Sequence, residues 1–541
     1  MMSAVRARFR DEQGIALPAV IILAVIMMTL VGATAGFAIN SLNTSRLDQD
    51  WNSALSAAEA GLDDYLYRLN RDSEYWLYNA SNLPSDGNVA FSQWVDVPGS
   101  SNSQFRYHVN TDQLSSEGII RIVSSGKVRG TVRTVEALLR RRNFLDYLYF
   151  TEYETIDPAM YTGYPFSASE AQAACAHHYY DSVGRHENCS NITFFSQDVI
   201  KGPLHSNDAI LISGTPTFQD STTTSWDGTC QNSECVASAD RYRGSGTPNF
   251  ANPGDPAYAP PLTLPPSNSE VKEKADAALG GEGCLFTGPT RITLNSNGTM
   301  NVTSPQTVSS NCQTGTSRPL PSNGVIYVQN QPSSGPNAGT CSSHPLGYPV
   351  SGDINTAQYG CGNGDAFVSG VLDGQLTIAA EDSVIITGNT TYAGGTTGDD
   401  LLGLVANNYV EIYHPVACND WEDGYCTSTS NLSGSLTNPT VQAAILTVDH
   451  SFRVQNYAYG SSLGTLSVFG TIGQLYRGAV GTFSGGSTTT GYSKNYTYDT
   501  KLRFTSPPHF LDPVASAWGI KTWAECKPFD APGTSGQTAC S

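Results

Sequence analysis

The segment between Cys175 and Cys189 combines two kinds of side chain that bind transition metals. It reads CAHHYYDSVGRHENC, so His177, His178 and His186 lie between the two cysteines. Thiolates and imidazoles are the ligands that zinc prefers. In an oxidising compartment, two cysteines this close in sequence more often form a disulfide, which removes the thiolates. We expect a Cys175–Cys189 disulfide, and the three histidines remain weaker metal candidates.

Acidic residues are clustered at three further places, 381–382, 399–400 and 420–423. Polysaccharide lyases and glycosidases use such carboxylates as acids, bases or calcium ligands. The spacing of Asp420, Glu422 and Asp423 is not that of an EF-hand loop, and few arginines accompany the clusters. We expect solvated turns on an acidic surface.

The segment GPLHSND places His205, Ser206 and Asp208 close together, but adjacency in sequence does not make a catalytic triad. No nucleophile-elbow pattern surrounds Ser206. With no motif that requires a metal or cofactor, the sequence favours a protein that is not an enzyme.

The chain has an even number of cysteines, and none precedes residue 175. Pairing each with its neighbour would close six short loops, which favours an extracytoplasmic protein. The surest pairs are Cys175–Cys189, Cys230–Cys235 and Cys418–Cys426. The 12 cysteines are Cys175, Cys189, Cys230, Cys235, Cys284, Cys312, Cys341, Cys361, Cys418, Cys426, Cys526 and Cys540.

Composition also favours a β-rich extracellular protein. Only 14% of the 541 residues are charged, and 52 are Gly and 29 Pro. The formal net charge of −19 repels phosphate backbones, so nucleic acid is not an expected partner.

From residue 144 onward, short apolar runs alternate with turns rich in Gly, Asn, Asp and Pro, as in DAFVSGVLDGQLTIAAEDSVIITG. This rhythm predicts a right-handed parallel β-helix over 144–513, with disulfide-pinned loops. A β-sandwich is the alternative, because its strands are also short and alternating. The aromatic segment 514–541 is predicted to cap the open end of the β-helix.

The elements that precede this region are a long helix and a small β-rich head. Residues 15–39 are apolar or small, and the pattern continues at three- and four-residue spacing, which predicts one helix over 15–70. Its first half is long enough to cross a bilayer. Within the head, 71–143, we predict strands at 119–124 and 128–139 joined by a turn at 125–127.

A basic stub, a glycine and a helix that is first apolar and then amphipathic together resemble a type IV prepilin. The resemblance implies a leader at 1–14, cleavage between Gly14 and Ile15, and methylation of the new N-terminus. Arg6, Arg8 and Arg10 in the leader agree with a cytoplasmic N-terminus.

The fifth residue of the mature chain would be Ala19, where the family usually has Glu. The segment AAEAGL, which contains Glu59, resembles PilX-type minor pilins. The segments GPLHSND, FVSGVLDGQLTIAAEDSVIITG and LVANNYVEIYHP resemble large PilX-like proteins of Gram-positive bacteria, and this resemblance covers most of the chain. Without the Glu, the subunit cannot neutralise the amino terminus of a neighbour in an apolar filament core.

The resemblance implies a minor pilin near the filament tip, in which the β-rich region serves adhesion or the initiation of assembly. Its partners would be other pilins, the prepilin peptidase, the assembly platform in the membrane, and a surface glycan or protein. It would lie first in the cell membrane and then in an extracellular pilus. The alternatives are a surface-anchored polysaccharide lyase or glycosidase and a membrane-anchored structural protein of the cell envelope.

Overall fold

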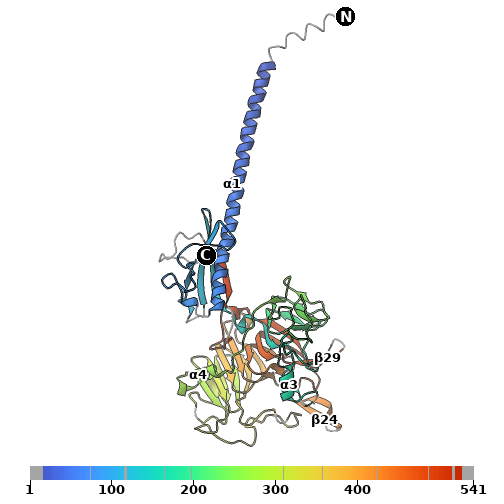
Figure 1. Cartoon of the computed structure of the whole chain (residues 1–541). Coiled ribbons are helices and arrows are strands. Elements are labelled where there is room, and N and C mark those ends of the chain that lie inside the picture. Colours follow the sequence, from blue (N-terminus) through green and yellow to red (C-terminus); the bar gives the residue numbers. More distant parts are fainter. Residues whose placement is uncertain are drawn as a thin grey trace, which may run out of the picture. The chain divides into compact units, whose positions relative to one another are not determined.

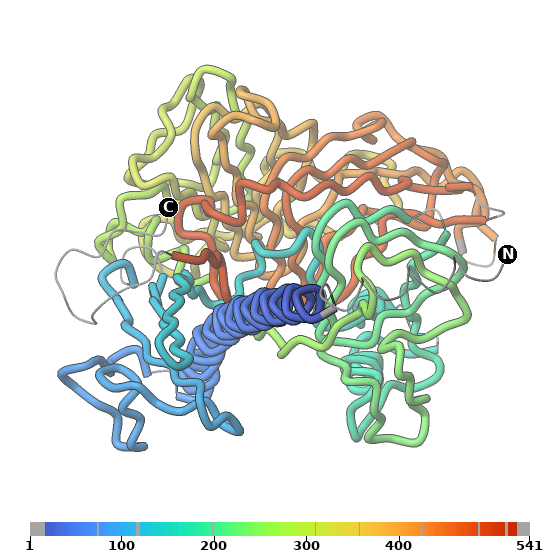
Figure 2. The backbone as a smooth tube through the Cα atoms, turned by 90° about the horizontal axis from the view of Figure 1, so that it is seen from above, coloured from blue at the N-terminus to red at the C-terminus, as the bar shows by residue number. Residues whose placement is uncertain are grey.

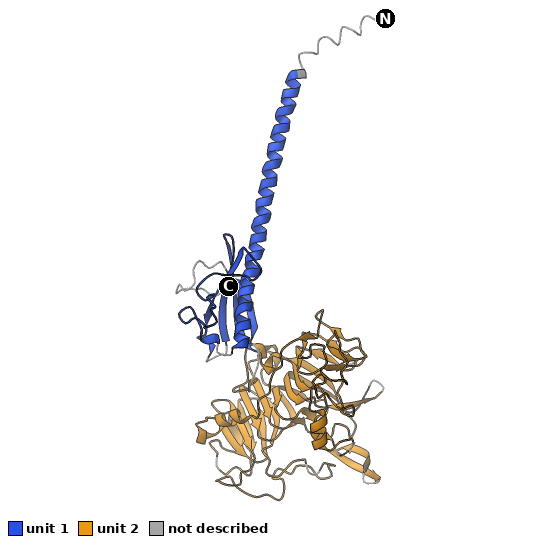
Figure 3. Ribbon diagram, viewed as in Figure 1, with its two compact units in different colours: residues 1–141, 518–541 blue, residues 142–517 orange. Residues whose placement is uncertain are grey.

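The computed structural model describes residues 16–72, 75–114, 119–161, 163, 165–196, 198–308, 310–355, 358–422, 425–484, 487–513 and 518–526. The chain forms two compact units (Figure 3). Unit 1 contains residues 1–141 and 518–541, and unit 2 contains residues 142–517. The predicted leader, 1–14, lies outside the described residues.

Unit 1 is built on a single helix, α1, which spans Ala16–Arg71 (Figure 1). Its 56 residues give a length of about 84 Å at 1.5 Å per residue. The side chains of its first half are exposed, whereas those that face the sheet in its second half are buried. The long N-terminal helix predicted from the apolar periodicity is therefore confirmed.

The second half of α1 packs on a five-stranded antiparallel sheet in the order β1-β2-β3-β4-β31. The elements of unit 1 after α1 are η1 (Tyr75–Leu77), β1 (Val95–Asp96), β2 (Ser103–Asn110), β3 (Ile119–Val128), β4 (Thr131–Arg141) and β31 (Trp518–Cys526). Between helix and sheet lies a core rich in aromatic rings, including Tyr65, Phe91 and Tyr107.

The segment predicted to cap the β-helix instead supplies the last strand of unit 1. In β31, Trp518 pairs with Arg141 and Cys526 pairs with Thr134, antiparallel to β4. The prediction of a cap is therefore wrong for 518–526. Alternating aromatic and polar residues are typical of any half-buried strand, and the sequence does not indicate which sheet the strand joins. Unit 2 is an insertion between two neighbouring strands.

The turn between β3 and β4 also differs from the prediction. β3 continues through Gly126 to Val128, and the turn is formed by Arg129 and Gly130. Arg129 has a φ of 54°, in the left-handed region, and its guanidinium lies 2.9 Å from the Asp50 carboxylate. Gly126 is required for another reason: a Cβ at this position would overlap the backbone of α1.

Unit 2 is mainly β, and twenty-two strands, β5 among them, are hydrogen-bonded into one large sheet. Its helices are η2 (Phe144–Asp146), η3 (Pro158–Met160), α3 (Ala168–Cys175), α4 (Ser269–Ala275), η4 (Ala277–Leu279), η5 (Gly395–Thr397) and η6 (Thr500–Arg503). Its first strands are β5 (Tyr149–Tyr153), β6 (Val199–Lys201), β7 (Leu204–Ser206), β8 (Ile210–Ile212), β9 (Thr217–Phe218), β10 (Thr222–Thr224), β11 (Tyr242–Gly244), β12 (Asn249–Phe250), β13 (Ala257–Tyr258), β14 (Cys284–Thr287), β15 (Thr290–Asn295), β16 (Thr299–Thr303), β17 (Gly315–Pro319) and β18 (Val325–Gln329).

The later strands of unit 2 include its longest, and β26, β28 and β30 pair side by side (Figure 2). A separate antiparallel pair, β24 and β25, carries Cys418 and Cys426. These strands are β19 (Ala366–Leu372), β20 (Gln375–Ala380), β21 (Val384–Tyr392), β22 (Leu401–Ala406), β23 (Val410–Ile412), β24 (Val416–Glu422), β25 (Tyr425–Asn431), β26 (Thr440–Thr447), β27 (Phe452–Val454), β28 (Ser462–Tyr476), β29 (Gly481–Ser484) and β30 (Ser487–Tyr498).

Most ladders in unit 2 are parallel, and they place apolar side chains in stacks. One stack, in register from β18 to β28, consists of Ile326, Ile378, Leu404, Ile445 and Ile472. All five are at most 1% exposed. A β-sandwich consists of antiparallel sheets, so parallel pairing disfavours that alternative. The pairings alone do not establish the coil of a right-handed parallel β-helix.

The close contact between α1 and β3 generates a prediction about Gly126. Replacing it with Ala should lower the free energy of unfolding of unit 1 by at least about 2 kcal/mol, because the methyl group would overlap the backbone of Ala54 and Ala58. Thermal or chemical unfolding of the full chain measures the effect. Gly130→Ala is the matched control, because a Cβ there meets nothing within 4 Å. Equal stability of the two variants would contradict the packing.

Candidate functional site

The first half of α1 presents a continuous apolar surface. Leu17, Met28 and Phe37 are 73%, 77% and 81% exposed, and the most apolar window of the helix has none of its residues buried. By length and composition the helix can cross a membrane. Exposed apolar surface of this extent indicates contact with lipid or with another protein.

Polar groups within this apolar half are satisfied inside the helix. The hydroxyl of Thr29 donates to the carbonyl of Ile26 at 2.9 Å, and that of Thr34 donates to Leu30 at 2.9 Å. A helix that satisfies its own polar groups is suited to an apolar environment, where an unpaired group costs several kcal/mol. Ala19 lies in this exposed half. Gly14 and Ile15 lie outside the described residues.

The AAEAGL segment forms the surface on which the helix meets the sheet. Ala57, Ala58 and Gly61 are buried, and the Ala58 carbonyl accepts a 2.7 Å hydrogen bond from the Ser124 hydroxyl of β3. The segment therefore has small residues where the two backbones approach closely. Glu59 is half-buried beside this contact.

The cysteines of unit 2 pair with their neighbours in sequence. The predicted pairs Cys175–Cys189, Cys230–Cys235 and Cys418–Cys426 are bonded, and none of the cysteines that the structure describes is free. The other two described pairs are Cys284–Cys312 and Cys341–Cys361. Cys526 is also disulfide-bonded, and Cys540 lies outside the described residues.

The three histidines of the 175–189 loop do not converge on one point. His178 lies between the carboxylates of Glu152, at 3.0 Å, and Asp181, at 3.1 Å. Burial opposes its protonation, but the two carboxylates outweigh burial and raise the pKa of His178 to about 10. A charged imidazole cannot bind a metal. His177 contacts a backbone carbonyl of α3 at 3.0 Å, and His186 accepts a backbone N–H at 3.1 Å. Among the described residues, no group of three or more His, Cys, Asp or Glu could hold a metal.

The loop is attached to the sheet by buried charges that the sequence did not reveal. Arg185 forms an ion pair with Asp208, and both side chains are at most 1% exposed. Burial opposes the charge of Asp208, but Arg185 outweighs burial and holds the pKa of Asp208 below its usual value. Asp208 also accepts the backbone N–H of Glu154 at 2.9 Å, and Glu154 pairs with buried Arg477 at 2.9 Å.

His205 and Ser206 are buried in this polar network and are not arranged as a nucleophile and base. The Ser206 hydroxyl donates to Glu154 at 3.1 Å. His205 contacts the side chain of Asn207 at 3.0 Å, and burial lowers the pKa of His205 to about 3. The imidazole is therefore neutral. His205 and Ser206 belong to β7, and Asn207 and Asp208 follow in the turn that leads to β8.

The predicted acidic clusters are occupied by turn contacts or face solvent. Asp400 accepts two backbone N–H groups at 2.7 Å each. Asp382 accepts the side-chain amide of Asn408 at 2.6 Å, and Glu381 accepts a backbone N–H at 2.9 Å. The exposed members of these clusters are Asp399, Asp420 and Glu422. Asp423 lies outside the described residues.

One carboxyl that sequence reasoning missed is Asp365, which is 1% exposed. One of its oxygens accepts the backbone N–H of Ser383 at 3.1 Å. Within the described part of the chain, its other oxygen has no hydrogen-bond partner. Burial first, and then the neighbouring charge of Asp382, raise the pKa of Asp365 well above its usual value. Its sequence context, GNGDAF, resembles an ordinary turn.

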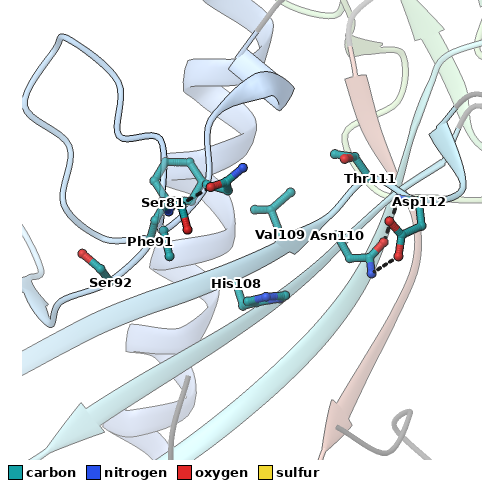
Figure 4. Close-up of a pocket in the computed structure, with 10 residues that line it drawn as sticks. Ser81, Phe91, Ser92, His108, Val109, Asn110, Thr111 and Asp112 are labelled. Atoms are coloured by element: carbon teal, nitrogen blue, oxygen red, sulfur yellow. Dashed lines mark hydrogen bonds between the residues drawn. The ribbon is translucent and has the colours of Figure 1, made fainter. Parts of the chain in front are cut away.

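A polar pocket of about 510 Å³ opens in unit 1 between the end of β2 and the segment 79–92, which precedes β1. Figure 4 shows Asn110 and Asp112 directed toward each other on its wall, and the Asn110 amide donates to the Asp112 carboxylate at 2.9 Å. Burial and the charge of Arg121 lower the pKa of His108, another wall residue. Nothing in the sequence indicated this pocket.

No protein-family model and no curated protein matches the chain. Three chains of solved structures match, and one is described as the crystal structure of the competence-associated pilin ComZ from Thermus thermophilus. It is 13% identical, and the match covers 88% of this chain and 97% of that chain with a TM-score of 0.27. A TM-score this low does not establish a shared fold.

The buried carboxyl of Asp365 generates a prediction about pH. Because the pKa of Asp365 is raised in the folded state, the carboxyl of the unfolded chain loses its proton at lower pH, near about 4. As pH rises above about 4, the titration of Asp365 therefore lowers the free energy of unfolding. Asp365→Asn should therefore stabilise unit 2 by on the order of 1 kcal/mol at pH 7. The gain should shrink toward pH 4. Chemical unfolding of the full chain at both pH values measures it.

The control for this prediction is Asp373→Asn, which changes an exposed aspartate nearby in the sequence. It should change stability little at either pH. A destabilising effect of Asp365→Asn at pH 7 would show that the folded protein needs the charged carboxylate.

Proposed function

We propose that this protein is a type IV pilin-like subunit, held in the membrane by the first half of α1 before it enters a filament. The observation that carries the proposal is the continuity of α1. The first half of this one helix exposes an apolar surface, and its second half packs on the antiparallel sheet of the head. An anchor alone does not require an unbroken helix that also forms the core of the head.

We place the subunit near the tip of the filament. With Ala19 at the fifth mature position, the subunit has no carboxylate there to pair with the amino terminus of another pilin. In the repeating shaft, this would leave an ammonium unpaired in an apolar core. Unit 2 is also large for a shaft in which closely spaced subunits repeat. A minor pilin of the PilX type accounts for both features.

For unit 2 we propose a right-handed parallel β-helix that is displayed outside the cell and is not an enzyme. The in-register stacks of apolar residues support the β-helix. The buried network around Glu154 and Asp208 supports a structural role for the candidate catalytic residues. Adhesion to a surface glycan or protein, or initiation of assembly, is then the role of unit 2. The cellular partners of the whole subunit are then other pilins, the prepilin peptidase and the assembly platform.

Because unit 2 is inserted between β4 and β31, the proposed roles of unit 1 in filament assembly and of unit 2 in attachment can be tested separately. Because Arg141 pairs with Trp518, an Asn-Gly turn can replace residues 142–517 and leave a hairpin. This variant should still support filament assembly but should lose surface attachment. Electron microscopy and a binding assay measure the two properties.

Truncation after residue 141 is the matched control for the hairpin variant. It removes unit 2 and also removes β31, so the head should be lost and the protein degraded. Undiminished attachment by the hairpin variant would contradict an adhesive role for unit 2.

Processing of the N-terminus gives a second test. We expect cleavage between Gly14 and Ile15, and Gly14→Leu should block it, because the peptidase of this family accepts only a very small residue there. Mass spectrometry of the N-terminal peptide from membrane-extracted protein measures the cleavage. A mature protein that begins at Met1 would favour an anchored envelope protein with no filament role.

A further inference from the structure

Strand β31 completes a core that the first part of the chain leaves open. Trp518 is 6% exposed and belongs to the aromatic core of unit 1. Its backbone is held at the end of α1, where the Trp518 N–H donates to Asn70 Oδ1 at 2.6 Å. The Asn70 amide donates back to the Trp518 carbonyl at 3.1 Å.

A second contact holds the other end of β31. The Arg133 guanidinium donates to the Glu525 carboxylate at 2.6 Å. The same guanidinium lies over the Trp51 ring, 4.6 Å from its centre, and donates to the Trp51 carbonyl at 3.3 Å. β31 is therefore held at Trp518 by Asn70 of α1, and at Glu525 by Arg133, which also contacts Trp51 of α1.

Unit 2 separates β4 from this last strand in the sequence. The entropic cost of bringing the ends of an unfolded loop together grows with its length, so β31 docks at a disadvantage while 142–517 is unfolded. Folded unit 2 removes this cost, because it holds its own two ends together. The Asn143 amide donates to the Asp512 carboxylate, and Tyr498 donates to the Leu145 carbonyl at 2.7 Å.

We propose that β31 is a closing strand that docks on β4 only when unit 2 is folded, so that the head is completed last. A chain whose inserted unit is damaged or incomplete then presents a head with an open β4 edge and a core lacking Trp518. This coupling is a check on the folding of unit 2 that does not depend on the proposed function.

The test is hydrogen exchange of the full chain in detergent micelles, measured by mass spectrometry across a series of urea concentrations. The amides of 518–526 should lose protection at the same urea concentration as those of β20 and β22 in unit 2. Ile378→Ala, at a side chain that is 0% exposed, should lower both midpoints by the same amount. In the hairpin variant, in which an Asn-Gly turn replaces residues 142–517, the 518–526 amides should remain protected. At the urea concentration that unfolds unit 2, their exchange should be at least ten-fold slower than in the full chain.

Several results would overturn the proposal. Protection of 518–526 that persists where unit 2 exchanges fully would show that the head closes independently, and so would a midpoint that Ile378→Ala leaves unchanged. Rapid exchange of 518–526 in the folded wild-type chain would show that the strand does not close the head. A doubled mass for the full chain, with 518–526 protected only in the dimer, would show that a second copy supplies the strand.

Discussion

The architecture of unit 1 depends on one close contact, between the small residues of α1 and Gly126 of β3. There is no space for a Cβ at Gly126, because the backbone of α1 at Ala54 and Ala58 lies directly against it. This contact sets the distance between helix and sheet, and the aromatic core around Tyr65 and Tyr107 fills the space farther along. Because the helix is unbroken, the same contact also fixes where its exposed apolar half projects from the head.

The other constraint is topological, because the chain leaves the head at Arg141 and returns at Trp518. A large unit can occupy this position since the two strands that flank it are hydrogen-bonded neighbours. The head sheet has five strands, and its last strand, β31, follows the inserted unit in the sequence. The Cys175–Cys189 disulfide closes the 175–189 loop, and the buried Arg185–Asp208 ion pair attaches that loop to the turn between β7 and β8.

Local patterns in the sequence predicted the long helix and a mainly β remainder, but not the contacts between distant segments. Gly126 has the local pattern of a turn glycine, and only the position of α1 shows that it permits a close approach. Trp518 pairs with Arg141 and Arg477 pairs with Glu154, each across most of unit 2 in the sequence. Asp208 pairs with Arg185, which no local pattern indicates. The stack from Ile326 to Ile472 recurs at unequal intervals, which explains the absence of a sequence repeat. In contrast, the bonds Cys175–Cys189 and Cys418–Cys426 are local, and their spacing was sufficient to predict them.

We have proposed that this protein enters a filament and lies near its tip. Immunogold labelling with antibodies against unit 2, on filaments sheared from cells, tests that claim most directly. A subunit at the tip should place gold particles at the ends of the filaments. Particles distributed evenly along the filaments would contradict the tip position, and label confined to the membrane fraction, with none on filaments, would contradict the pilin-like role itself.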